Sequence, residues 1–485
     1  MNRKPNILFL MTDHANAQAF APGSPCLTPN LDALASDGIQ FGRCYTPNAI
    51  CSPARASLMT SLYPSSHGMW CCTHTQPKGW VDVPADRFTY FSHRLADAGY
   101  KNGYFGKWHV EQSCKLEDFG WHEYEVRQTG LRNYGHLEKL VDLSTEGYDD
   151  FPLAGLNTRE GELNHPAYDR GVDFIKRAAG GDQPFCCFVS TYEPHDPYEA
   201  PKRFYDLYDP DCIPLSPTLH DELSGKPDIV RRMQKVCRNL TDDDWRKVTV
   251  AYWATLSYVD SQVGRILDVL RETGQYDNTI IVFTSDHGDM LGGHGLITKG
   301  AGTPYEEVYN IPLIMRVPGM PSGMYDAESI VNLVDLAPTL LELCDVDPLP
   351  EAHGHSISPV LRRDQDASNW RDGYAEFFAQ TFFYTQRIVW HDQWKYVFSP
   401  GGIDELYNLE NDPHEKNNLA DNPGHQDVLK QMCCRMWQKM YDIGDEKNFN
   451  SQYVTIRTAP IGPLAIRDQS NGISCRRRHI AAPEK

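Results

Sequence analysis

The amino-acid sequence predicts an α/β protein with one large central sheet, mostly parallel or mixed, flanked by helices and followed by a smaller C-terminal α+β subdomain. Short apolar runs alternate with amphipathic stretches over the first two-thirds of the chain, which is typical of strands alternating with covering helices. The character changes after about residue 365, where an alternating segment precedes one more helical segment. With 485 residues, of which 41% are hydrophobic and 23% charged, the chain can bury a sizeable core.

Five apolar runs are predicted as strands of the large sheet. Each is short, and each is followed by polar or turn-forming residues, as expected of strands buried on both faces. They are Ile7–Met11, Gly103–Gly106, Pro184–Ser190, Thr279–Thr284 and Pro312–Val317.

Four further stretches are predicted as helices. The first is Pro29–Asp37, with Thr28 as N-cap, proline at the first helical position and Gly38 after the last. Apolar residues recur every three to four positions in the longest stretch, which makes one face of that helix apolar. The other three are Phe88–Ala98 before Gly99, Trp245–Thr273 before Gly274, and the buried stretch Ile330–Cys344.

The remaining segments predict surface excursions and a C-terminal unit. Residues 115–165 and 201–232 are polar and rich in glycine or proline, so they are expected to be long surface segments. Near the C-terminus, a short antiparallel sheet and a helix are expected. Arg387–Phe398 alternates like a strand, Glu405–Asn408 begins a polar turn region, and the helix spans about Gln426–Asp442. We therefore expect a large domain over residues 1–365, a subdomain over 366–445 and an arm over 446–485.

Charge and cysteine usage limit the possible partners and compartment. The 46 basic and 65 acidic residues give a net charge of −19, which argues against nucleic-acid and anionic-membrane binding. No stretch has the roughly 20 apolar residues of a membrane span, and the N-terminal apolar run is too short for a signal peptide. The 14 cysteines contain no CxxC pair, so we expect thiols in a reducing cytoplasm.

Two predicted strands end alike. Asp13 and His14 follow the first apolar run, and Asp286 and His287 follow the fourth. Because ligands of open α/β sheets bind beyond the carboxyl ends of the strands, these side chains can converge on one divalent cation. Each aspartate could instead simply cap the following turn, but the repetition favours a metal site. Carboxylate ligands favour calcium, magnesium or manganese.

Cys51 lies at a predicted helix N-terminus. Proline is tolerated in the first turn of a helix, and Pro53 follows Cys51 by two residues. The backbone N–H groups there favour an anion, and Arg55 lies one turn along on the same face. Such a thiol should have a lowered pKa and be reactive, although a buried structural cysteine is the commoner case.

Cys51-Ser52-Pro53-Ala54-Arg55 matches the C-x-P-x-R signature of the type I sulfatases, and the rest of the chain also resembles that family. The resemblance implies the fold of the alkaline phosphatase superfamily and hydrolysis of an organic sulfate ester, from a small molecule or a saccharide. The further matching stretches are Lys4–Ile7, Thr28–Asp32, Gly106–His109, Glu193–His195, Ser285–Gly288, Lys299, Tyr305–Glu307, Glu405–Leu409 and Asp412-Pro413.

The same resemblance implies roles for individual residues. Cys51 would be oxidised to formylglycine by a formylglycine-generating enzyme, and the hydrated aldehyde would be the nucleophile. Asp13, His14, Asp286, His287 and the modified Cys51 would hold the metal, while Arg55 would stabilise the hydrate. Lys107 and Lys299 would bind the sulfate oxygens, and His109 and His195 would transfer protons.

His14 departs from the family pattern, which has a second aspartate, or sometimes glutamine, at this position. Calcium is the expected ion, but imidazole in place of a carboxylate shifts the preference towards magnesium or a transition metal such as manganese. His14 could also turn away and leave the ion one ligand short.

Two alternative functions remain open at this point. Phosphonate monoester and phosphodiester hydrolases of the same superfamily share the signature cysteine, but the intact Gly106–His109 motif favours sulfate. A protein in which Cys51 stays a thiol would be a catalytically inactive binding protein. Finally, the basic Arg476–Arg478 segment of the C-terminal arm is read as a solvated tail, and the alternative is a homo-oligomer in which the arm packs on an acidic neighbour.

Overall fold

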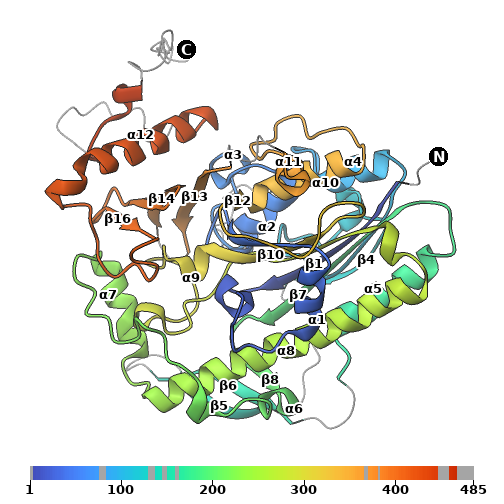
Figure 1. The fold of residues 1–485 in the computed structure, drawn as a ribbon, viewed down its shortest axis with the longest axis horizontal. Helices are drawn as coiled ribbons and strands as arrows, with labels where there is room; N and C mark the ends of the chain where they lie inside the picture. Colours follow the sequence, from blue (N-terminus) through green and yellow to red (C-terminus); the bar gives the residue numbers. More distant parts are fainter. Residues whose placement is uncertain are drawn as a thin grey trace, which may run out of the picture.

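The structure is a computed structural model, and it shows a large sheet with helices on both faces beside a smaller C-terminal sheet (Figure 1). This arrangement confirms the predicted fold class. The residues that it describes are 4–75, 83–128, 137–144, 150–158, 163–364, 370–380, 383–445 and 458–466.

The large sheet has the strand order β11-β2-β10-β9-β1-β7-β3-β4, and β12 also pairs with β2. Strand β10 is antiparallel to both of its neighbours, and the other pairings are parallel. The strands are β1 (Asn6–Asp13), β2 (Ile39–Tyr45), β3 (Lys101–Lys107), β4 (Glu123–Arg127), β7 (Phe185–Pro194), β9 (Thr279–Ser285), β10 (Asn310–Arg316), β11 (Met324–Asp326) and β12 (Val331–Asn332).

All five predicted strands are present, as β1, β3, β7, β9 and β10. Strand β2 was not predicted, because glycine and arginine interrupt its apolar residues and only part of it is buried. Strands β1, β7 and β9 are the central neighbours, and most of their residues are completely buried. They are therefore apolar throughout, as strands covered on both faces must be.

Alternate residues of β1 point to opposite helical layers. Leu8 and Leu10 pack in the core formed with α1, α5 and α8, whereas Ile7 and Phe9 pack in the core with α2, α4, α10 and α11. Figure 1 shows these two groups on opposite sides of the sheet. The helices are α1 (Pro29–Ser36), α5 (Pro166–Ala178) and α8 (Asp242–Glu272) on one face, and α2 (Cys51–Thr60), α4 (Phe91–Asp97), α10 (Leu336–Leu343) and α11 (Ser358–Arg362) on the other.

The predicted helix ends need correction in three places. The stretch Ile330–Cys344 is helical only in α10, because Asn332 and Asp335 cap each other's backbone and a short 3-10 turn precedes the helix. The predicted helix Phe88–Ala98 begins at Phe91. Thr28 occupies the N-cap position of α1, but its hydroxyl donates to the Asp32 carboxylate rather than capping the backbone.

The segment 115–165 is more regular than its sequence predicts. It contributes β4 to the large sheet, and β5 (Leu137–Leu143) and β6 (Phe151–Asn157) pair with β8 (Tyr198–Pro201) in a separate sheet beside α8. The exposed positions in β4 weaken its alternating pattern, which explains why it was read as irregular. The segment 201–232 does contain only short elements, including α6 (Lys202–Tyr205) and α7 (Asp228–Gln234).

The C-terminal sheet is a four-stranded antiparallel meander with one helix packed on it. Arg387–Phe398 is not one strand but the end of β14 and the whole of β15, joined by a turn. Glu405–Asn408 forms a strand rather than a turn region. The elements are β13 (Asp372–Ala379), β14 (Phe383–His391), β15 (Trp394–Phe398), β16 (Glu405–Asn408) and α12 (Gln426–Asp442).

The proposed boundary at residue 365 lies outside the described residues, and of the arm 446–485 the structure describes 458–466. There, the Ile461 carbonyl accepts a hydrogen bond of 2.7 Å from the Trp437 indole of α12. No helix in the described ranges is long and apolar enough to cross a membrane.

Candidate active site

The two strand ends that carry Asp-His pairs meet in the structure. Strands β1 and β9 are parallel neighbours, and their register places Thr12 opposite Ser285. Asp13 and Asp286 therefore emerge side by side at the carboxyl edge of the sheet, and the side chains of both are fully buried. The register with β7 brings Pro194 opposite Asp13, so the Glu193–His195 motif reaches the same edge.

Cys51 is the first residue of α2, and its sulfur faces this edge. The sulfur lies 3.1 Å from His287 Nε2 and 3.5 Å from the Asp13 carboxylate. Burial alone would raise the pKa of the Cys51 thiol. Cys72, Lys107, Lys299 and His287 outweigh burial and hold that pKa well below its ordinary value. The sulfur is therefore held as an anion among cationic groups.

Arg55 lies one turn further along α2 and binds Asp286 rather than the sulfur. Its Nε donates to Asp286 Oδ2 at 2.8 Å, and its Nη1 donates to Ser190 Oγ and to the Lys107 carbonyl. Its Nη2 has no hydrogen-bond partner within the described part of the chain, although the side chain is completely buried. This nitrogen therefore keeps N–H donors for a further acceptor.

Two buried lysines contact residues of this cluster. The Lys107 ammonium contacts the Asp13 carboxylate, and the Lys299 ammonium contacts the Nε2 atoms of His14 and His195. Burial would lower the pKa of Lys299, but Cys51, Asp196 and Asp13 raise it above its ordinary value. Lys299 is therefore a permanent cation in a chain with a net charge of −19.

His109 and His195 are in opposite electrostatic environments. Burial and Lys107 lower the pKa of His109 to about 4. Burial and Lys299 also act to lower the pKa of His195, but Asp196 and Asp13 reverse this effect and raise it to about 9. At neutral pH, His109 is therefore a neutral base, whereas the His195 and Lys299 nitrogen atoms, 2.9 Å apart, hold one proton between them.

The geometry fits a divalent cation. The donor atoms of Asp13, Cys51, Asp286 and His287 lie within 4.8 Å of one another, and all four residues are buried. His287 Nδ1 lies 3.0 Å from the Gly288 carbonyl, which orients Nε2 towards the cluster. Two carboxylates and an imidazole aimed at one point suit a hard or borderline ion.

His14 belongs to an adjoining donor group. Its donor atoms group with those of Asp13, Cys51 and His195 rather than with Asp286 and His287. The residue adopts a φ of 72°, in the left-handed region that non-glycine residues rarely occupy. Its ring faces the centre of the site, with centroids 3.9 Å from His195 and 4.5 Å from His287.

Sequence reasoning missed four residues of this site. Asp196 and Asp289 contact His14, the Cys72 sulfur lies within 4.8 Å of the Cys51 sulfur, and His74 Nδ1 lies 3.2 Å from His109 Nε2. Asp196 adjoins the Glu193–His195 motif, and Asp289 follows His287 by two residues. Their closeness to these motifs could have identified both aspartates as site residues.

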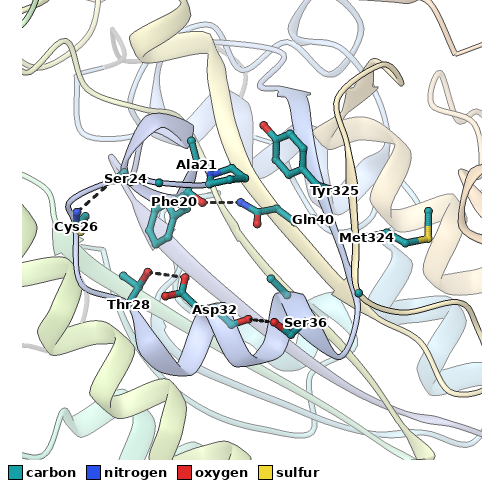
Figure 2. A pocket seen from close by; sticks show the side chains of 15 residues that line it. Phe20, Ala21, Ser24, Cys26, Thr28, Asp32, Ser36, Gln40, Met324 and Tyr325 are labelled. Carbon is teal, nitrogen blue, oxygen red and sulfur yellow. Dashed lines mark hydrogen bonds between the residues drawn. The ribbon is translucent and has the colours of Figure 1, made fainter.

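A separate pocket lies near the start of α1. Figure 2 shows it lined by residues that include Phe20, Asp32, Gln40 and Tyr325, with Gln40 donating to the Phe20 carbonyl. None of the predicted site residues lines it. The candidate site is therefore the cluster at the strand ends and not this pocket.

A mostly parallel α/β sheet that carries a buried cysteine, a donor cluster and fixed cations at its carboxyl edge fits a hydrolase that acts on an anionic ester. Residues 5–346 match the Sulfatase family, and residues 292–442 match the family described as N-sulphoglucosamine sulphohydrolase, C-terminal. The chain belongs to the sulfatase family.

Curated relatives agree with this assignment over nearly the whole chain. Sulfatase YidJ of Escherichia coli (strain K12) is 31% identical over 455 residues, which cover 91% of this chain and 88% of the relative. Choline-sulfatase of Rhizobium meliloti (strain 1021) is 30% identical over 453 residues, which cover 87% of this chain and 83% of the relative.

Solved structures share the fold. A protein in complex with its substrate D-glucosamine-2-N,6-O-disulfate has a TM-score of 0.74 at 22% identity, covering 92% of this chain and 99% of that chain. A phosphonate monoester hydrolase from Silicibacter pomeroyi has a TM-score of 0.71 at 22% identity, covering 94% and 99%. At these identities the likeness concerns the fold alone.

Proposed function

We propose that this sulfatase hydrolyses an organic sulfate ester to an alcohol and inorganic sulfate at Cys51, after conversion of Cys51 to formylglycine by a formylglycine-generating enzyme. The observation that carries the proposal is the position of the Cys51 sulfur, 3.1 Å from His287 and 3.5 Å from Asp13 at a helix N-terminus. Formylglycine at this position would supply a hydrated aldehyde oxygen as the nucleophile.

Asp13, Asp286, His287 and the modified Cys51 would hold the metal, with His14 at its edge. The ion, for which we propose calcium before magnesium or manganese, would supply positive charge beside the reacting oxygen atoms. Metal analysis of the purified enzyme identifies it. The two carboxylates support this assignment, since calcium and magnesium prefer oxygen ligands.

Residues of the chain bind the sulfate group and transfer the protons. Lys107 and Lys299 bind the sulfate oxygens and stabilise the charge that they carry in the transition state, and Arg55 stabilises the hydrated aldehyde. His195 donates the proton that it shares with Lys299 to the leaving alcohol oxygen. His109, neutral at neutral pH, accepts a proton at the nucleophile, near which its ring lies.

The substrate class is proposed from the relatives. They include a choline-sulfatase and an N-acetylglucosamine-6-O-sulfatase of Bacteroides thetaiotaomicron. A small-molecule or saccharide sulfate ester is therefore the proposed substrate. Neither nucleic acid nor a membrane is proposed as a binding partner. Hydrolysis rates on choline sulfate, sulfated glucosamines and aryl sulfates would identify the preferred group.

Paired esters test sulfate against phosphonate. The kcat/KM for an aryl sulfate should exceed that for the matching phenylphosphonate ester, since two buried lysines suit a compact anion that has no second organic substituent. A clear preference for the phosphonate would assign the chain to the phosphonate hydrolase alternative.

Mass spectrometry of the peptide containing Cys51, from protein made with the maturation enzyme, tests the modification. Formylglycine lowers the peptide mass relative to cysteine. An unmodified thiol in metal-loaded protein that lacks sulfatase activity would instead support the inactive binding protein.

Three further properties are proposed, each with the experiment that tests it. We propose a catalytic domain at 1–365, a subdomain at 366–445 and an arm at 446–485, and limited proteolysis would locate these boundaries. A cytoplasmic location is supported by the 13 cysteines of the described residues, all of which are thiols, and cell fractionation tests it. Association of copies through the arm predicts a smaller oligomer after truncation at residue 445.

A further inference from the structure

Asp289 lies in the loop after β9 and is completely buried. Its Oδ2 atom lies 2.9 Å from His14 Nδ1 and accepts a hydrogen bond of 2.8 Å from the Tyr198 hydroxyl. The Asp196 carboxylate is the next acidic group to His14 Nδ1, at 3.6 Å. Asp289 is therefore the residue that engages the outer nitrogen of the His14 ring.

The other oxygen of Asp289 has two backbone partners. The amides of Leu291 and Thr298 each donate to Oδ1 at 3.0 Å. Thr298 precedes Lys299 and has a φ of 58°, so this contact fixes the turn that carries the Lys299 side chain into the site. A single carboxylate thus joins the His14 ring to the Lys299 turn.

The hydrogen-bond donors around the Asp289 carboxylate indicate which nitrogen of His14 carries the proton. A carboxylate has about four acceptor positions, and Tyr198, Leu291 and Thr298 fill three of them with donors. The fourth faces His14 Nδ1, which completes the set only as an N–H donor. A neutral imidazole has one N–H, so Nε2 keeps its lone pair, which faces the Lys299 ammonium and accepts from it.

We propose that Asp289 is a positioning residue that holds His14 as the Nδ1–H tautomer, presents the Nε2 lone pair to the Lys299 ammonium at the edge of the metal centre, and fixes the Lys299 turn. This inference rests on the proposed function for the identity of the centre, but the tautomer itself does not depend on catalysis. It gives a physical reason for histidine at this position, because a buried carboxylate behind the ring orients imidazole as a ligand and makes it more basic.

Asp289→Asn tests the inference. The backbone N–H groups of Leu291 and Thr298 can only donate hydrogen bonds, so the side-chain oxygen of the variant stays with them. Its side-chain NH₂ group then faces His14 Nδ1. Two donors cannot pair, so the ring should move its proton to Nε2 and break its contact with the Lys299 ammonium. In ¹⁵N-histidine-labelled, chelator-treated full-length protein, long-range ¹H–¹⁵N NMR identifies the protonated nitrogen, and His14→Gln assigns the His14 signal by its loss.

The expected results are a protonated Nδ1 in the wild type, a protonated Nε2 in Asp289→Asn, and a Kd for Ca²⁺ or Mn²⁺ weakened about 10- to 100-fold in the variant. The matched control is Asp335→Asn, because Asp335 is another buried carboxylate that accepts two backbone amides. That control should leave both the His14 tautomer and the metal Kd unchanged.

A protonated Nε2 in the wild type would overturn the inference without any variant, so misfolding of Asp289→Asn does not prevent the test. A variant that kept the Nδ1–H tautomer or the wild-type Kd would also overturn it. The proposed function fails separately, through absence of sulfate ester hydrolysis in metal-loaded, formylglycine-containing wild type, whatever tautomer His14 adopts.

Discussion

Arg55 and Asp286 form an ion pair of 2.8 Å in which neither side chain is exposed to solvent. The pair joins the first turn of α2, which begins at Cys51, to the loop after β9. Because two buried charges depend on each other here, the loss of either partner costs more than the pair itself contributes. The same contact therefore fixes the start of α2 relative to Asp286, a member of the buried donor cluster.

Arg55→Lys is expected to reduce kcat/KM for an aryl sulfate by about 100- to 1000-fold. One ammonium cannot replace the Nε contact to Asp286, the Nη1 contacts to Ser190 and the Lys107 carbonyl, and the unpartnered Nη2 together. The measurement is steady-state kinetics on the metal-loaded enzyme, with the formylglycine content of each variant determined first.

The matched control for Arg55→Lys is Arg387→Lys. Arg387 is another buried arginine that binds a buried aspartate, Asp445, but it lies in the C-terminal sheet. Its replacement should lower the melting temperature and leave kcat/KM per folded molecule unchanged. Equal losses of activity in the two variants would show that Arg55 acts through stability alone.

Lys299→Met should reduce kcat/KM by about 100-fold or more while the protein still folds. The methionine has a similar volume, and the lost ammonium is the group that contacts His14 and His195. Lys202→Met is the control, since Lys202 forms only an exposed ion pair with Asp206. Full activity in Lys299→Met would remove Lys299 from the sulfate-binding residues.

The central sheet could be predicted from sequence because β1, β7 and β9 are buried on both faces and therefore carry continuous apolar runs. Strand β16 could not, because it has only four residues and polar residues stand at both of its ends. Its Glu405 is buried against Tyr305, Tyr407 and Lys226, and the partners Tyr305 and Lys226 are far away in the sequence. A local sequence pattern does not show that distant residues will pair with a buried charge.

The same division applies to the active site. Asp13, Cys51 and Asp286 stand next to strand ends or a helix start, so their convergence follows from topology. The partner of Arg55 was not predictable, since the helix places it near the Cys51 group while the guanidinium reaches Asp286 instead. Asp289 was missed because its role depends on the His14 contact, which bridges 275 positions of the sequence.

Removal of the metal should abolish activity and lower the melting temperature. Chelator-treated enzyme should regain both when the native ion is added, because an ion that binds only the folded state adds about 2.7 kcal/mol at one hundred times its Kd. Asp13→Asn should lose most of this ligand-dependent stabilisation, since it removes one charged donor of the cluster. The measurement is differential scanning fluorimetry against ion concentration. Wild-type activity that survives complete removal of the metal would contradict the metal-dependent mechanism.

Asp335 provides a pH-dependent test of stability far along the chain from Cys51. Its carboxylate is buried between the backbone amides of Asn332 and His355, which donate to it at 2.8 and 2.9 Å. Burial raises the pKa of Asp335 to about 6, although those two hydrogen bonds oppose the change. In the unfolded chain the pKa is about 3.9, so the native state binds this proton more tightly.

The free energy of unfolding contributed by Asp335 should therefore fall as pH rises from about 4 to about 6, by about 3 kcal/mol, and stay constant above that range. The Asp335→Asn variant has no carboxyl group that can titrate at this position. The free energy of unfolding of the wild type minus that of the variant therefore isolates the contribution of Asp335. Urea unfolding of both proteins at matched pH values measures it. A difference that stays flat between pH 4 and pH 7 would show that Asp335 keeps its unfolded pKa, and a difference that rises with pH would mean that the two amide hydrogen bonds outweigh burial.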